Sequence, residues 1–125
     1  MSFMEILKAV HGIISNTVVL FFLALGIWGV YRAFRRYTVD GSYIGALVIG
    51  EALFVLQGIL GAVLYLGDAR PGRVVHFIYG SFVLVALPGL FAYLKGDDSN
   101  QAQLYFGLAA ISLFGVALRA ISTGA

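Results

Sequence analysis

Residues 12–31 read GIISNTVVLFFLALGIWGVY and contain no charged side chain. Because a helix rises about 1.5 Å per residue, this run extends about 30 Å, the thickness of the hydrocarbon core of a bilayer. The run therefore predicts a membrane-spanning helix, which we expect to occupy residues 3–31 in full.

Three further apolar segments of similar length follow in the sequence. They are residues 42–67, 74–94 and 102–121. The loops between the four segments are short and comprise residues 32–41, 68–73 and 95–101. Short loops make sequential helices antiparallel neighbours. The sequence thus predicts an all-α integral membrane protein, with residues 1–125 forming a single antiparallel four-helix bundle.

The composition agrees with a membrane protein. Of the 125 residues, 61% are hydrophobic and only 11% are charged, whereas soluble domains average about 25% charged residues. The absence of cysteine excludes disulfides, thiolate metal sites and c-type haem attachment. The basic residues flank apolar segments, which is typical of membrane topology and not of nucleic-acid binding. We expect the first apolar segment to be retained, because no small-residue cleavage site follows it.

The basic residues also predict an orientation. Each side of the predicted bundle carries four of them, but Arg32, Arg35 and Arg36 cluster in one short loop. Positive charges in short loops tend to stay inside the cell. We therefore expect a multi-pass protein of the inner (plasma) membrane, with both termini and both histidines toward the outer face.

The two histidines of the chain occupy matched positions. The sequences Lys8-Ala9-Val10-His11 and Arg73-Val74-Val75-His76 each place a basic residue three positions before a histidine and a valine directly before it. A shift of 65 positions superimposes the two motifs, which indicates a weak internal repeat of two helical hairpins. Because an ionisable side chain inside a bilayer is costly, such a residue is a candidate functional group.

The two histidines are also expected at one depth. His11 lies 21 residues before Arg32, and His76 lies 19 residues before Lys95, which correspond to about 31 Å and about 28 Å of helix. The first and third helices of a sequential bundle are diagonal partners, so the two imidazoles can meet across its centre. One imidazole on each side of a flat macrocycle gives a six-coordinate haem iron. We therefore interpret His11 and His76 as metal ligands of one haem b.

Other residues fit this interpretation. Ser15 and Gly80 lie one turn deeper than the histidines on the same helix faces, and their small side chains would leave room for a porphyrin. Lys8, Arg73 and Arg119 are predicted near the histidine level, where cations would neutralise the haem propionates. Alternatively, Lys8 and Arg73 are ordinary interfacial side chains that reach for the headgroups.

The histidines also admit other interpretations. A membrane histidine can hydrogen-bond a neighbouring helix or handle protons. Zinc and copper are less favoured, because no third or fourth ligand of the usual kind is predicted at that depth. Glu51 lies 11 residues after Asp40, about 16 Å into the membrane. It could pass protons to a quinone or a haem, or be a neutral carboxyl bonded to a neighbouring helix or subunit.

Residues 5–94 resemble part of a known family. The stretch Val55-Leu56-Gln57-Gly58-Ile59-Leu60-Gly61-Ala62-Val63, followed by Pro71 and Val75-His76-Phe77, is similar to a segment of haem A synthase. Each half of that enzyme has a histidine early in one helix, a Leu-Gln-x-x-Leu-Gly-like stretch in the next and a histidine that opens the third. The resemblance implies that His11 and His76 are axial haem ligands near the outer face.

The sequence also departs from that family. Where the family has Glu-x-x-His-Arg, this chain has Lys8-Ala9-Val10-His11-Gly12, so the glutamate linked to the oxidative chemistry is absent. The chain is half the family's length and lacks its paired cysteines. The resemblance therefore implies a small b-type cytochrome, or a haem-free relative, and not haem A synthesis by this chain alone.

Three functions follow from these observations. The first is an electron-transfer cytochrome b that is not an enzyme on its own and works within a larger redox complex. The second is a haem-free structural subunit of such a complex. The third is a quinone- or proton-handling protein that uses Glu51. The expected partners are the lipid bilayer and either other membrane subunits or a quinone, and not nucleic acid.

Overall fold

A computed structural model describes residues 2–67 and 74–124, and these ranges contain four α-helices and no strand. The helices are α1 (Phe3–Phe34), α2 (Gly41–Leu66), α3 (Val75–Leu94) and α4 (Asn100–Gly124). Each of them is long and apolar enough to cross a membrane. The predicted all-α, multi-pass membrane fold is therefore confirmed.

Local signals at the helix ends explain these boundaries. Helix α1 begins after Ser2, whose Oγ accepts the Glu5 backbone N–H at 3.1 Å. Helix α2 begins after Asp40, whose carboxylate accepts the Tyr43 backbone N–H at 2.9 Å. Both are N-caps, which satisfy backbone donors that have no partner within the helix. Helix α3 ends at Leu94, and the next residue, Lys95, adopts the left-handed conformation common after helix C-termini.

The first helix is longer than the sequence predicts. The prediction ends it at residue 31 and places Arg32 in the loop, but α1 continues to Phe34. The Arg32 side chain is only 12% exposed, and its Nε donates to Gln103 Oε1 at 3.0 Å. Because protein groups compensate its charge, Arg32 does not need to leave the helix. Helix α4 is also longer than the predicted range 102–121.

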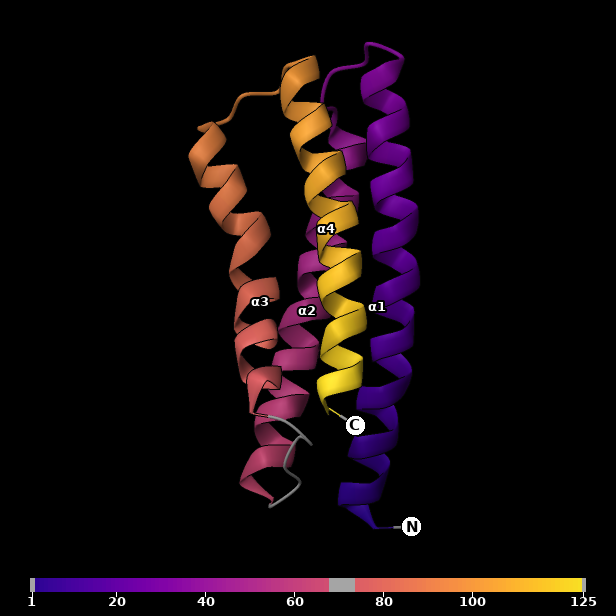
Figure 1. Cartoon of the computed structure of the whole chain (residues 1–125), viewed down its shortest axis with the longest axis vertical. Coiled ribbons are helices and arrows are strands. Elements are labelled where there is room, and N and C mark those ends of the chain that lie inside the picture. The colour runs from indigo at the N-terminus through magenta and orange to yellow at the C-terminus, as the bar shows by residue number, and fades with distance from the viewer. Residues whose placement is uncertain (1, 68–73, 125) are drawn as a thin grey trace.

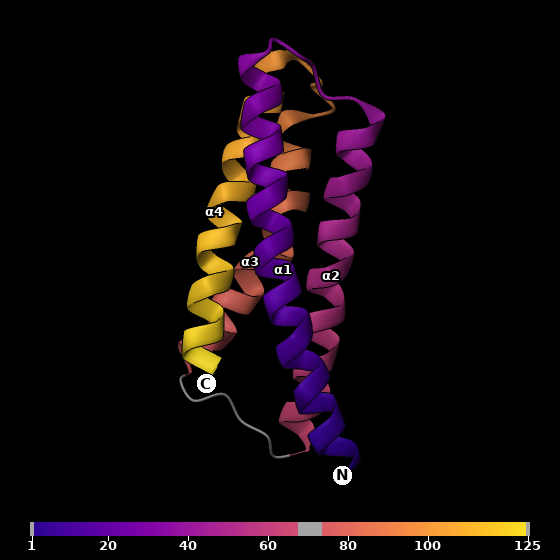
Figure 2. The ribbon, with the colours of Figure 1, turned by 90° about the vertical axis from the view of Figure 1, so that its right-hand side faces the viewer.

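The helices form a bundle in which sequential helices run antiparallel (Figures 1 and 2). Within the described residues, α1 packs on α2 and most extensively on α4, and α3 packs on α2 and α4. Helices α1 and α3 are thus diagonal, as predicted. Both termini lie at the same end of the bundle (Figure 1). We call that end, which carries His11 and His76, the histidine end, and the opposite end, which carries Arg32, the arginine end.

Close packing holds α1 against α4. A methyl group added at Gly107 of α4 would lie 2.7 Å from Val30 N and 2.8 Å from the carbonyl carbon of Gly29, both in the α1 backbone. Only glycine permits this approach, which is the usual role of small residues between membrane helices. Between α1 and α2, the rings of Phe22 and Phe54 stack with their centroids 4.6 Å apart.

The outer surface of the bundle is apolar. Leu20 is 67% exposed, Ile78 65% and Val85 62%. Large apolar side chains on the outside of a helical bundle are expected where the solvent is lipid. The apolar outer surface therefore supports the membrane assignment independently of helix length.

Candidate functional site

The two histidines lie at the same end of the bundle on diagonal helices. His11 belongs to the first part of α1, and His76 is the second residue of α3. Both are half-buried, and they are close enough to interact electrostatically. The prediction that the two imidazoles meet across the centre of the bundle stays a prediction, and the fold places both residues at one end of it.

His76 is held by the backbone of α4. Its Nδ1 lies 2.8 Å from the Ala120 carbonyl oxygen. Since a carbonyl only accepts hydrogen bonds, Nδ1 carries the hydrogen in this contact, and the neutral ring keeps its lone pair on Nε2. Histidines that bind metals commonly have this arrangement, in which a backbone carbonyl fixes the tautomer and the other nitrogen faces the metal.

The close contact between His76 and α4 depends on two neighbours that the sequence analysis did not identify. A methyl group added at Gly124 would lie 2.8 Å from His76 Cε1, so the glycine makes room for the ring. Thr123 is fully buried, and its Oγ1 lies 3.4 Å from His76 Nδ1. Neither residue carries a motif, so no signal in the sequence marks them.

His11 lies against α2, and a polar network forms beside it. Gln57 Nε2 donates to the His11 carbonyl oxygen at 3.0 Å and to Ser15 Oγ at 2.7 Å. Ser15 Oγ in turn donates to the same carbonyl at 2.8 Å. A methyl group at Gly61 would be in ordinary contact with the imidazole, at 3.6 Å. Ser15, predicted only as a small residue beside a porphyrin, is thus a hydrogen-bonding member of the site.

Two atoms of this network have no hydrogen-bond partner within residues 2–67 and 74–124. They are His11 Nδ1 and Gln57 Oε1, and both are buried. An unpaired buried polar atom costs roughly 1–3 kcal/mol, and such atoms in a native protein call for an explanation. The side chains of His11 and Gln57 are near each other, but His11 Nδ1 and Gln57 Oε1 do not form a hydrogen bond.

The predicted propionate partners are placed as follows. Lys8 and Arg119 are exposed, and within residues 2–67 and 74–124 neither forms an ion pair. Arg119 is adjacent to Ala120, which contacts His76, so it lies at the histidine level as expected. Arg73 lies outside the described residues.

Gly80 and Glu51 complete the predicted set. No atom lies within 4 Å of a methyl group added at Gly80, so the space beside it on α3 is open. Glu51 lies in the interior of α2, and its Oε2 is buried without a hydrogen-bond partner. The predicted bond between Glu51 and a neighbouring helix is therefore not formed by this oxygen.

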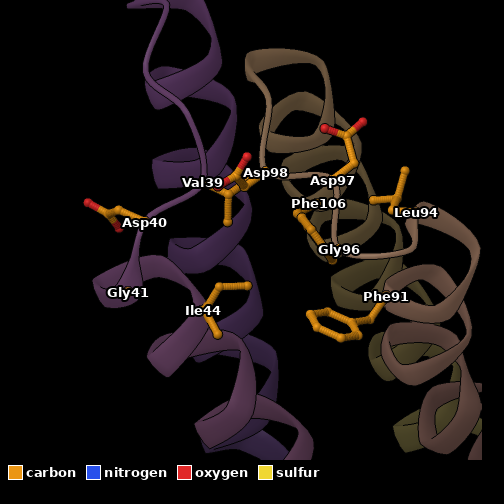
Figure 3. A pocket seen from close by; sticks show the side chains of 10 residues that line it. All are labelled: Val39, Asp40, Gly41, Ile44, Phe91, Leu94, Gly96, Asp97, Asp98 and Phe106. Carbon is orange, nitrogen blue, oxygen red and sulfur yellow. The ribbon is translucent and has the colours of Figure 1, made fainter.

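Clusters of metal ligands and cavities are the other kinds of site that a bundle can offer. In residues 2–67 and 74–124, no three His, Cys, Asp or Glu side chains gather where they could hold a metal ion. A cavity of about 320 Å³ lies at the arginine end, where Ile44 and Phe91 face each other between α2 and α3 (Figure 3). Its wall contains no histidine, so it offers no axial ligand to a haem.

Comparison with known proteins identifies no relative of this chain. No protein family, curated protein or solved structure matches this chain. The similarity of the Gln57–Val63 stretch and the two histidines to haem A synthase therefore stays a prediction.

The donor set at the histidine end fits a bis-histidine haem. A six-coordinate haem iron needs two axial nitrogens from opposite sides, which His11 and His76 on diagonal helices would supply. His76 presents Nε2, because its Nδ1 is used by Ala120 O. His11 Nε2 could serve as the second axial nitrogen, because within the described residues the unpaired buried nitrogen of His11 is Nδ1. Exposed cations at Lys8 and Arg119 suit the carboxylates of a haem.

Proposed function

We propose that this protein is a small integral membrane b-type cytochrome whose single haem is held by His11 and His76. The observation that carries the proposal is that the two histidines lie at one end of the bundle, on helices that do not pack on each other directly within the described residues. A bound haem would supply one-electron transfer. The chain itself supplies the two ligands, their tautomers and the apolar surroundings.

The residues around the histidines have distinct roles in this proposal. The Ala120 carbonyl orients the His76 ring, and Gly124 allows the ring to lie against α4. Lys8 and Arg119 supply positive charge for the propionates, and the open space at Gly80 lies beside the ligand on α3. Such a protein would pass electrons to a partner, which we expect to be another subunit of a membrane redox complex.

The proposal is tested by haem titration of the purified protein in lipid nanodiscs. The wild-type chain should give the Soret and α/β bands of a low-spin six-coordinate haem. His11→Ala and His76→Ala should each lower the affinity for haem by more than about 100-fold or convert the spectrum to five-coordinate, since losing an axial ligand exceeds the loss from an outer partner.

Imidazole rescue provides the control for folding. Free imidazole should restore the six-coordinate spectrum of either variant if only the ligand is missing. Wild-type protein that acquires no Soret band, alone or with its partner subunits, would eliminate the cytochrome and leave the haem-free structural subunit.

A second function rests on Glu51. Its buried and unpartnered Oε2 is unfavourable for a charged carboxylate in lipid, so we propose as the alternative that Glu51 exchanges protons with a quinone. Glu51→Gln should then abolish quinone-dependent turnover of the redox complex while leaving the haem spectrum unchanged. Unaltered turnover would assign Glu51 a structural role.

The proposed location is the inner (plasma) membrane, with the histidine end toward the outer face. The chain has no cysteine, so single cysteines introduced at Thr38 and at Ser122 report the two ends separately. In intact cells an impermeant maleimide should label the Ser122→Cys protein and not the Thr38→Cys protein. The opposite pattern reverses the orientation.

A further inference from the structure

The hydrogen bonds of Gln57 leave one group of its amide unused. Nε2 donates to the His11 carbonyl at 3.0 Å, which can only accept, so the identity of the nitrogen is fixed by its partner. Its second hydrogen goes to Ser15 Oγ at 2.7 Å, because the Ser15 hydroxyl hydrogen is already donated to His11 O. Both amide donors are therefore used, and Oε1 is left as a buried acceptor.

The unpaired atom of His11 is the complement of this acceptor. Nδ1 is buried and has no partner. If Nδ1 carries the hydrogen, as it does in His76, the ring presents a donor beside the one acceptor that Gln57 has left. The Gln57 amide nitrogen already binds the His11 carbonyl, so the acceptor and the imidazole belong to two residues that are in contact.

We propose that Gln57 is the positioning residue of His11, whose Nδ1–H it binds through Oε1 so that Nε2 is directed to the haem. The inference rests on the proposed function for the haem, but the tautomer that it requires exists without haem. Gln57 would do from α2 what the Ala120 carbonyl does for His76 from α4. Each ligand would thus be oriented by the next helix of its own hairpin.

The tautomers can be measured directly, because the chain contains only two histidines. Haem-free protein labelled with ¹⁵N-histidine in nanodiscs gives signals from two rings, and His11→Ala assigns them. At about pH 8.5, above the usual pKa of histidine, both wild-type rings should carry hydrogen on Nδ1. A wild-type His11 with hydrogen on Nε2 overturns the proposal, and this result needs no Gln57 variant.

Variants of Gln57 separate positioning from packing. Gln57→Met keeps the length of the side chain but removes the acceptor, so it should move His11 toward the Nε2–H tautomer and leave His76 unchanged. Gln57→Glu keeps an oxygen at the same position and should retain the Nδ1–H tautomer. An unshifted His11 tautomer in Gln57→Met assigns Gln57 to packing alone. Ser15→Ala is the matched control, because it breaks the network without removing Oε1.

The haem-bound protein gives a second measurement. Gln57→Met should weaken haem binding about 10-fold to 100-fold, as losses of outer partners usually do. It should also change the low-spin electron paramagnetic resonance spectrum, which responds to imidazole orientation. Failure of wild-type protein to bind haem would refute the proposed function and not this inference, which the haem-free tautomer decides. A Gln57→Met protein whose spectrum and haem affinity are identical to those of wild type would refute the positioning role.

Discussion

The two ends of the bundle are built differently. At the arginine end, Arg32 donates to Gln103 Oε1 and to the Thr38 carbonyl, pairs with Asp40 at 3.3 Å and lies over the Trp28 ring. At the histidine end, His11 Nδ1 and Gln57 Oε1 are buried without partners among the described residues. The arginine end thus has its polar groups paired inside the protein, whereas the histidine end retains two unpaired buried atoms.

Hydrogen bonds to backbone carbonyls also connect the loops of the arginine end. The Val39 N–H donates to the Asp98 carbonyl at 2.9 Å, and the Asn100 side chain donates to the Ala33 and Tyr37 carbonyls at 2.9 Å. These bonds join the two loops of the arginine end. Because unpaired polar groups cost stability, the arginine end stabilises the fold, whereas the histidine end carries the residues of the proposed haem site. The predictions below test this division through the free energy of unfolding.

The largest loss is expected where α1 meets α4. Gly107→Ala places a methyl group 2.7 Å from Val30 N, and since backbone cannot move aside as a side chain can, the helices must separate. We expect a loss of about 3 kcal/mol, measured by unfolding in mixed micelles with circular dichroism. Gly115→Ala, on the same helix with no atom within 4 Å, is the matched control and should be neutral or stabilising by up to about 1 kcal/mol.

Removal of Arg32 should have the next largest effect. In Arg32→Ala, Gln103 Oε1 loses its partner while remaining fully buried, so we expect a loss of about 2–3 kcal/mol. Arg32→Lys should recover only part of it, because one ammonium cannot reach all three acceptors. Circular dichroism is the measurement, since Trp28 fluorescence would respond to the loss of the overlying guanidinium itself. Stability equal to wild type would contradict the assignment of the arginine end.

A smaller effect is expected at Asp40 in acid. The Tyr43 backbone N–H and, more weakly, Arg32 hold the pKa of Asp40 below its ordinary value. A carboxyl with a lowered pKa stabilises the fold fully above its ordinary pKa, and this stabilisation is lost as the pH falls through the folded-state pKa. The difference in stability between wild type and Asp40→Asn should therefore be constant above about pH 5 and shrink below about pH 4. A difference that is independent of pH would contradict this role.

The smallest change in stability is expected at the histidine end. Arg119 is exposed, so Arg119→Ala should change the free energy of unfolding by less than about 0.5 kcal/mol. The effect of Arg119→Ala should appear in the haem-bound protein. Removal of a cation there disfavours the added electron and lowers the reduction potential of the haem. An unchanged potential would show that Arg119 faces lipid headgroups and not a propionate.

The sequence was sufficient for the fold because lipid imposes a simple rule. Each run near 20 apolar residues must be a helix, as unpaired backbone polar groups are too costly in hydrocarbon. The short loops then place residues 3–31 and 74–94 on diagonal helices, and the count of residues from Arg32 places His11 near the opposite surface. These inferences need only helix geometry, so the placement of His11 and His76 at one end of the bundle could also be predicted.

Only the tertiary structure decided which groups touch the histidines. Ala120 binds His76 through its backbone carbonyl, an atom that every residue possesses, so no residue type in the sequence could mark it. Gln57 meets His11 because α2 has a particular rotation and height beside α1, and those depend on packing around Phe22 and Phe54. Helix rotation in a bundle whose outside is as apolar as its inside leaves little periodic signal in the sequence, because lipid and core accept the same side chains.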